Sequence, residues 1–308
     1  MSRRDREPRF GTVITAMVTP FTDRGDLHLD AAASLARWLV EHGSDGLVVA
    51  GTTGEGVALS DAERRDLWAA VSEAVTVPVL AGSGTNDTRH SIELTRSATE
   101  AGVDGILLVT PYYNRPSQSG IYDHFAATAA ATHLPVLLYD IPGRTGRRIE
   151  AGTMLRLAGE VGNVVGVKDA AGDVVGTSRV IAEAPDHFEV YSGEDALTLA
   201  LLAVGAVGVV SVASHWVGVE MGAMAAAFSK GDVEGARSIN ARLLESFRFE
   251  SSEACPNPLP TKSVLRALGL PVGQCRLPMG AAPVELDRAA AGLVRRLELE
   301  AFTGSPGA

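Results

Sequence analysis

Val164-Val165-Gly166-Val167-Lys168-Asp169-Ala170 is a short apolar run that ends in a lysine. A valine-rich run of this kind is typical of a strand that is buried on both faces of a parallel sheet. At the carboxyl end of such a strand the Lys168 amine would lie against apolar neighbours, and desolvation lowers the pKa of an ammonium group. A neutral lysine amine can attack a carbonyl carbon and form a Schiff base. Taken alone, the stretch also fits a surface lysine just past a strand. The rest of the sequence is needed to distinguish the two interpretations.

The surroundings repeat one pattern along the chain. Each unit begins with an apolar, β-rich run, passes through a turn rich in Gly, Pro and Thr, and continues into an alanine-rich helical stretch. The eight apolar runs lie at residues 13–19, 46–50, 77–81, 105–110, 135–139, 164–168, 188–191 and 208–212. Eightfold alternation of strand and helix predicts an α/β fold with a closed (β/α)8 TIM barrel, and an open doubly wound sheet is the alternative.

Amphipathic helical patterns lie between the runs, and examples are residues 31–42, 61–75, 88–101 and 120–132. Ser60 with Glu63 is a capping box, and Thr88 is a weaker start of the same kind. After Lys230 the pattern contains only helices, at 231–250, 260–268 and 284–300. We therefore expect a disordered tail at 1–10, a barrel catalytic domain at 11–230, a C-terminal helical domain at 231–302 and a disordered tail at 303–308.

The composition argues against several classes of protein. With 46% hydrophobic and 21% charged residues among 308, the chain is globular, and its net charge of −10 offers no basic patch for nucleic acid. The longest apolar runs are interrupted by glycine and are too short to span a membrane. Residues 1–9 are charged and are not a signal peptide, and two cysteines suit the cytoplasm. No spacing of histidines and cysteines indicates a metal site.

Active sites of such barrels lie at the carboxyl ends of the strands. Besides Lys168, the unusual residues of this chain follow the second, fourth, fifth and seventh runs, at 51–56, 110–116, 139–146 and 192–195. Three of the five tyrosines lie at these ends. This clustering favours one site at one end of the barrel.

Each of these features also has an ordinary structural interpretation. The glycine-rich loop after the second run could cradle a phosphate, but it lacks the Lys-Ser ending of a P-loop. Tyr112 and Tyr113 could be rim aromatics, and Arg144 could stabilise its own turn. We interpret Asp169 and Glu194 as hydrogen-bonded carboxylates at strand ends rather than as catalytic acids.

Taken together, the same residues assemble one chemistry. Lys168 can form an imine with a keto acid, and the hydroxyls of Thr52 and Thr53 can receive its carboxylate. A tyrosine can move protons, and Arg144 can hold a second carboxylate with two parallel hydrogen bonds. These groups suffice for an aldol reaction through an enamine, without a cofactor or a metal.

With these residues the chain resembles the dihydrodipicolinate synthase family. This family belongs to the superfamily of pyruvate-dependent class I aldolases that includes N-acetylneuraminate lyase. The matching stretches span nearly the whole chain and are 15–21, 51–55, 110–118, 139–146, Lys168, 192–195 and 256–260. The resemblance implies that Lys168 forms the Schiff base with pyruvate and that Tyr139 relays protons near the imine. It also implies that Thr53 links Tyr139 to Tyr113, which reaches in from a neighbouring subunit.

The resemblance also implies how the substrates bind. Thr52, Gly193 and Val210 match positions around pyruvate, and Arg144 matches the arginine that holds the carboxylate of L-aspartate 4-semialdehyde. The expected enzyme is a cytoplasmic lyase of diaminopimelate and lysine biosynthesis, and a homotetramer built from two tight dimers. One alternative is an aldolase for a sugar acid, for which the turn at Arg144 has less use. Another is a non-catalytic relative that binds keto acids.

Some members of the family are inhibited by lysine, which binds in a cleft between two subunits. The matching positions are Gly56, Asp61, Arg64, Asn86, His90 and Tyr112. Only Asn86 and Tyr112 agree with inhibited members, and His90 stands in place of a glutamate that pairs with the ammonium group of lysine. We therefore predict an enzyme that is insensitive to lysine, unless Asp61 supplies a substitute carboxylate.

Overall fold

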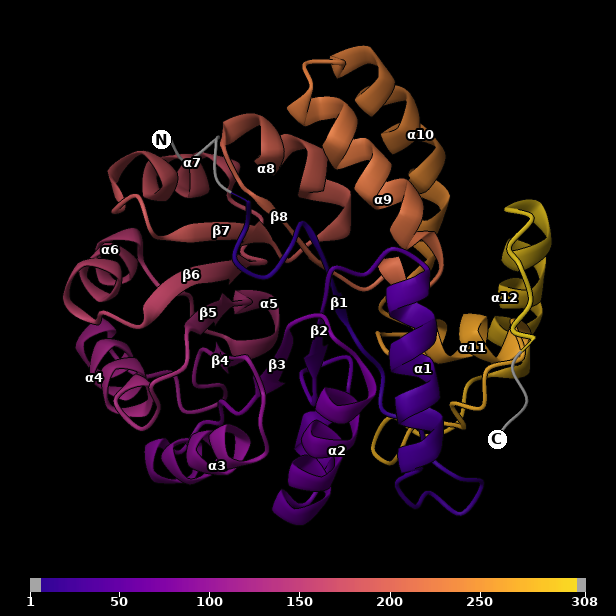
Figure 1. Ribbon diagram of the computed structural model, residues 1–308, viewed down its shortest axis with the longest axis horizontal. Helices are drawn as coiled ribbons and strands as arrows, with labels where there is room; N and C mark the ends of the chain where they lie inside the picture. The colour runs from indigo at the N-terminus through magenta and orange to yellow at the C-terminus, as the bar shows by residue number, and fades with distance from the viewer. Residues whose placement is uncertain (1–6, 304–308) are drawn as a thin grey trace.

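The computed structural model describes residues 7–303, and within them eight parallel strands close into a barrel (Figure 1). Each strand pairs with the next, and β1 also pairs with β8, with Ile14 beside Val210. The strands are β1 (Val13–Ala16), β2 (Gly46–Val49), β3 (Val79–Gly82), β4 (Gly105–Val109), β5 (Val136–Asp140), β6 (Val164–Asp169), β7 (Glu189–Ser192) and β8 (Gly208–Ser211). The pairing of first and last strands confirms the predicted barrel and excludes the open sheet.

The predicted strands are all present, but several of their ends differ. The first ends at Ala16 rather than at residue 19, because the next residues leave the barrel: the Val18 N–H bonds to His215 and the Thr19 hydroxyl to Gly54. The third begins at Val79, two residues later than predicted. In both cases β-branched residues lie just outside the strand, Val18 and Thr19 after β1 and Val77 before β3.

Helices surround the strands, as Figure 1 shows. They are α1 (Leu29–Glu41), α2 (Asp61–Ala74), α3 (Thr88–Glu100), α4 (Gln118–Ala129), α6 (Ala151–Glu160), α7 (Val174–Glu183), α8 (Thr198–Val204) and α9 (Ser214–Ser229), with short helical turns η2 (Gly56–Ala58), α5 (Pro142–Thr145) and η3 (Asp195–Leu197) at strand ends. The capping box of Ser60 and Glu63 is confirmed at the start of α2. The predicted start of the next helix at Thr88 is confirmed, but its cap is Asp87, whose side chain accepts from the N–H groups of Arg89 and His90.

Three further helices follow the barrel, namely α10 (Val233–Phe249), α11 (Leu259–Ala267) and α12 (Val284–Arg296). Helix α10 packs along α9, and α11 packs against α12. The first begins at Val233 rather than at 231, because Gly231 has a φ of +82° and Asp232 caps the helix. No helix within the described residues is long and apolar enough to cross a bilayer. The division of the chain into a barrel domain and a helical domain stays a prediction.

The two predicted tails lie partly outside the described residues, which omit 1–6 and 304–308. Near the start, the Arg9 N–H donates to the Glu189 carboxylate, and Phe10 is 2% exposed. Phe10 belongs to a cluster inside the barrel that is separate from the larger core between strands and helices. The chain therefore packs against the barrel before residue 11.

Candidate active site

Lys168 reaches the barrel interior because β6 contains a bulge. Consecutive residues of β5 pair with Val164 and Gly166, so Val165 is skipped. Without this extra residue, alternation would place Val165 and Val167 inside and Lys168 outside. In the structure Val165 belongs to the inner cluster and Val167 to the outer core. The change of phase between them turns the lysine side chain inward.

Two glycines make this arrangement possible. A Cβ on Gly166 would lie 2.3 Å from the carbonyl oxygen of Glu189 on the neighbouring strand, so only glycine fits at the bulge. A Cβ on Gly193 would lie 2.9 Å from the Cγ atom of Lys168. The first glycine lets the strand change phase, and the second leaves room for the lysine stem.

Tyr139 is the nearest aromatic partner of the amine. It pairs with Lys168 across β5 and β6, and the lysine Nζ lies 4.3 Å from the centroid of its ring. Each residue is only 4% exposed. Val210 on β8 lies in the same inner cluster as Tyr139 and is 1% exposed. The Lys168 amine is therefore held among apolar groups, beside a phenol, which is a group that can carry a proton.

A cavity of about 270 Å³ is lined by Tyr139 and by residues of the surrounding loops. Its wall includes Thr52, from the loop after β2, and Arg144, from the short helix α5. Arg144 is exposed, and its Nη2 donates to the backbone carbonyl of Asn257 at 3.2 Å. Arg64 and Arg276 also line the cavity, but Arg64 is buried and Arg276 is paired with Glu63, so Arg144 is the exposed arginine of the wall that suits a ligand carboxylate.

Thr53 lies behind this wall rather than on it. Its side chain is buried, and its Oγ1 accepts a hydrogen bond of 2.9 Å from Nδ2 of Asn257. Tyr113 behaves differently, because it is 89% exposed and has a φ of +73°, which is unusual for a side chain of its size. The structure thus gathers the predicted site residues at one barrel end, except that Tyr113 points to solvent.

Comparison with known proteins identifies the family to which this site belongs. Residues 9–295 match the model of the Dihydrodipicolinate synthetase family. The chain belongs to this family. The match confirms the resemblance, and the open question becomes how this member arranges its site.

Three relatives illustrate the similarity. The 4-hydroxy-tetrahydrodipicolinate synthase of Moorella thermoacetica is 52% identical, with 92% of this chain and 98% of the relative covered. A DHDPS from Cyanidioschyzon merolae, solved with lysine bound, is 42% identical with a TM-score of 0.90, over 93% and 97% of the two chains. A dihydrodipicolinate synthase from Acinetobacter baumannii complexed with pyruvate is 34% identical with a TM-score of 0.89, over 94% and 99%.

The sequence reasoning missed what the C-terminal helices contribute to this member of the dihydrodipicolinate synthetase family. Asn257 bonds to Thr53, and the fully buried Lys262 lies 2.7 Å from the Glu55 carboxylate, in the loop after β2. The backbone N–H of Arg276 donates to the other oxygen of Glu55. The stretch 256–260 resembles the family, and the only local signal for Asn257 is its place as a polar residue between two prolines.

The Asp169 carboxylate is hydrogen-bonded at the end of its strand, as interpreted from the sequence. Its Oδ2 accepts from the Thr177 hydroxyl and its Oδ1 from the Ala171 N–H. Asp140 beside it is 1% exposed and accepts one bond, from the Ile149 N–H at 3.0 Å. Burial, with the nearby charge of Asp169 as a smaller cause, raises the pKa of Asp140 from 3.8 to about 7.

This raised pKa makes Asp140 a source of pH dependence in stability. Its contribution is fully present below pH 3.8 and is lost as the pH rises through about 7, because the folded state then has to bury a charge. We expect Asp140→Asn to raise the free energy of unfolding at pH 8 by about 2–4 kcal/mol, since asparagine can accept the same bond without ionising. Denaturant unfolding at pH 5 and pH 8 measures this, and an equal effect at both would contradict it.

Proposed function

We propose that Lys168, Tyr139 and Arg144 are the centre of the reaction in this enzyme. The activity itself follows from the family and the relatives: the chain is a 4-hydroxy-tetrahydrodipicolinate synthase, a lyase of diaminopimelate and lysine biosynthesis. Its substrates are pyruvate and L-aspartate 4-semialdehyde. The observation that supports the assignment of residues is the buried Lys168 amine, 4.3 Å from the ring of Tyr139.

The first half of the reaction uses pyruvate alone. The Lys168 amine attacks the keto carbon, and loss of water leaves an imine. A proton then leaves the methyl group of the bound pyruvate, and Tyr139 relays it, which gives the enamine. Thr52, Gly193 and Val210 surround the pyruvate in this proposal. Their places support it, because Gly193 borders the lysine stem and Val210 shares the inner cluster with Tyr139.

The second half joins the aldehyde. The enamine carbon attacks the aldehyde carbon of L-aspartate 4-semialdehyde, and the aldehyde oxygen takes up a proton. The amino group of the substrate then attacks the imine carbon, which closes the ring and releases the Lys168 amine. Arg144 holds the substrate carboxylate at the cavity mouth. Reduction with borohydride in the presence of pyruvate, followed by mass spectrometry, tests the imine, and a coupled assay with the semialdehyde tests the second substrate.

The enzyme is further proposed to act as a homotetramer of two tight dimers. Tyr113 is 89% exposed beside the site, and Leu277 and Val57, which line the cavity, are 83% and 76% exposed. Large apolar side chains exposed together are typical of surfaces that another protein covers. A second copy that covers this mouth would bring its own Tyr113 towards the Thr53 of its neighbour.

We expect a symmetric oligomer by light scattering at assay concentrations, and Tyr113→Ala should reduce kcat roughly a hundred- to ten-thousandfold, as the loss of one proton-transfer group does. Val175→Ala, in the first turn of α7 and outside the cavity wall, changes another exposed apolar residue and should leave kcat unchanged. A fully active monomer would show that Tyr113 is not shared.

The cytoplasmic location is also kept as a proposal. Cys255 and Cys275 are both free, which suits a reducing compartment. Cell fractionation with an antibody against the chain tests it, and recovery outside the cytoplasm would overturn it.

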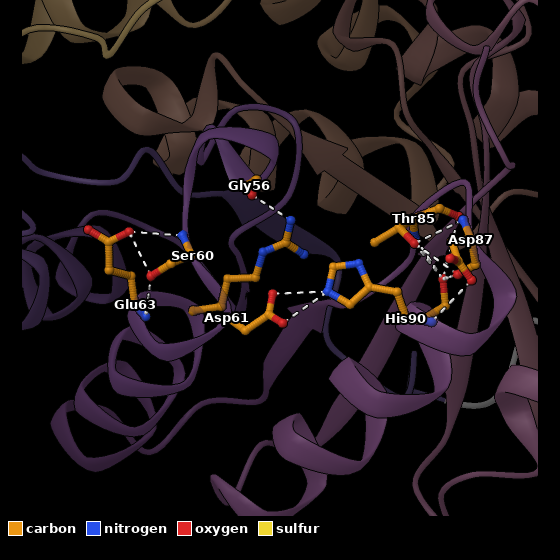
Figure 2. Close-up of polar contacts among 9 residues, drawn as sticks. Gly56, Ser60, Asp61, Glu63, Thr85, Asp87 and His90 are labelled. Atoms are coloured by element: carbon orange, nitrogen blue, oxygen red, sulfur yellow. Dashed lines mark hydrogen bonds and ion pairs between the residues drawn. The ribbon is translucent and has the colours of Figure 1, made fainter.

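The contacts of the residues that match the lysine site support the prediction that lysine does not inhibit this enzyme. Figure 2 shows that His90 faces Asp61, and its Nε2 lies 3.0 Å from both carboxylate oxygens. Asp61 is therefore already paired, which weakens the one argument for a substitute carboxylate. Arg64 is 5% exposed and donates to the Gly56 carbonyl at 2.6 Å, so it adds a positive charge where a cationic ligand would bind.

We accordingly expect less than half-inhibition of the coupled assay at about 1 mM L-lysine, because an ion pair to the ammonium is missing. Titration of lysine measures this directly. Clear inhibition below that concentration would refute the prediction. His90→Glu should then bind lysine more tightly than the unchanged enzyme, since it restores a carboxylate and frees Asp61.

A further inference from the structure

Asn257 connects two parts of the site that lie far apart in the sequence. It is 7% exposed, it lies between α10 and α11, and it forms part of the cavity wall. Its Nδ2 donates to the Thr53 hydroxyl at 2.9 Å, and its backbone carbonyl accepts from the Arg144 guanidinium at 3.2 Å. One residue of the C-terminal helical region therefore contacts both the proposed proton relay and the proposed holder of the second substrate.

The direction of the amide is set by a third contact. Thr261 is fully buried, and its hydroxyl donates to Oδ1 of Asn257 at 3.1 Å. The two ends of an amide differ in kind, since the oxygen only accepts and the nitrogen only donates. With Oδ1 bonded to Thr261, the nitrogen faces Thr53.

A donor at this place decides what the Thr53 hydroxyl can do. Because Thr53 Oγ1 accepts from the amide, its own hydrogen is free to be donated elsewhere, and accepting one bond strengthens the bond that it donates. We propose that Asn257 is a positioning residue that points the Thr53 hydroxyl hydrogen towards the Tyr139 relay. This inference rests on the proposed role of Thr53 between the tyrosines.

The loop that carries Thr53 has a second, independent anchor. Lys262 and Glu55 form a buried ion pair at 2.7 Å, and the Arg276 N–H donates to Glu55 at 2.8 Å. These contacts attach the loop to the C-terminal helices without the Asn257 side chain. A change of the amide alone should therefore alter proton transfer more than it alters the fold.

Asparagine can be tested against aspartate, which has the same shape but cannot donate when ionised. In Asn257→Asp the carboxylate would accept the Thr53 hydrogen and reverse the bond. Asn257→Ala removes the donor without adding charge. Both variants should leave the relay hydroxyl pointing in the wrong direction, while the Lys168 amine stays in place.

Two half-reactions separate these effects. Borohydride trapping with pyruvate reports the imine, and exchange of the pyruvate methyl hydrogens in D2O, followed by NMR, reports the step from imine to enamine. We expect both variants to trap the imine as the unchanged enzyme does and to lose roughly a hundredfold in exchange, the lower end of what a positioned proton-transfer group contributes. The KM for pyruvate should stay the same, while kcat falls with the exchange rate.

Asn163→Asp is the matched control. The Asn163 amide donates to backbone carbonyls, just before β6 and outside the cavity wall, so its change should lower stability and leave the ratio of exchange to trapping unchanged. Unchanged exchange in both Asn257 variants would overturn the proposal. A parallel loss of trapping and exchange would overturn it too, because a merely structural residue behaves in that way. Absence of trapping in the unchanged enzyme would refute the proposed function instead.

Discussion

Lys168→Ala is expected to lose all covalent trapping of pyruvate by borohydride while the barrel stays folded. The chain has only three lysines, so the labelled peptide is easy to assign. Lys262 is fully buried in an ion pair with Glu55, and Lys230 is exposed at the end of α9. Only Lys168 combines a buried amine with a tyrosine at 4.3 Å. Mass spectrometry of the reduced protein measures the adduct.

Lys230→Ala is the control, and it should be labelled as fully as the unchanged enzyme. Circular dichroism of both variants establishes that the fold survives. A pyruvate adduct that persists in Lys168→Ala at the same yield would show that the amine lies elsewhere, and the assignment of the site would be wrong.

Arg144→Ala is expected to damage the use of L-aspartate 4-semialdehyde far more than imine formation. A charge-assisted hydrogen bond at a partly exposed site contributes about 1.5–3 kcal/mol. Its loss corresponds to roughly ten- to a hundredfold in kcat/KM for the second substrate. Arg144→Lys keeps the charge but not the fork of two parallel donors, so its loss should be intermediate. Steady-state kinetics with each substrate varied in turn measure the difference.

Arg148→Ala is the matched control, because Arg148 lies in the same segment but pairs with Asp173 outside the cavity wall. It should leave both substrates unaffected. If Arg144→Ala slows imine formation and aldehyde use equally, Arg144 serves mainly to hold Asn257 and the turn, and another group must bind the second carboxylate.

The barrel could be predicted because its information is local and repeated. Eight apolar runs with turns and helical spacing between them leave few alternatives, and the capping box at Ser60 even locates the start of α2. The ends of strands were harder, since Val18 and Thr19 favour extended backbone although they bond outside the ladder. Propensity indicates that a residue suits a strand, and it does not indicate whether a neighbouring strand is still there.

The candidate site could be predicted only in part, for a similar reason. The apolar runs end in Tyr139 and Lys168, and the turn after Tyr139 contains Arg144. The rule that barrel sites lie at strand ends therefore identifies all three residues. Asn257 lies 204 residues from Thr53, and no local pattern links the two. The Lys262–Glu55 pair has the same origin in long-range packing. Such contacts depend on how the C-terminal helices lie on the barrel, which periodicity does not reveal.

The extra residue in β6 decides which face of the sheet carries Lys168, and catalysis therefore depends on the register of this strand. Every position before Lys168 on that strand is valine or glycine, so a slip by one residue would exchange the two faces at little cost in buried apolar surface. A chain that folded in the slipped register would keep its helices and its compactness, and its amine would face the helical layer. Circular dichroism alone would not distinguish such a molecule from the native one. Borohydride with pyruvate labels only chains in which Lys168 faces the barrel interior. The labelled fraction of a preparation therefore measures the share of chains that have β6 in the native register.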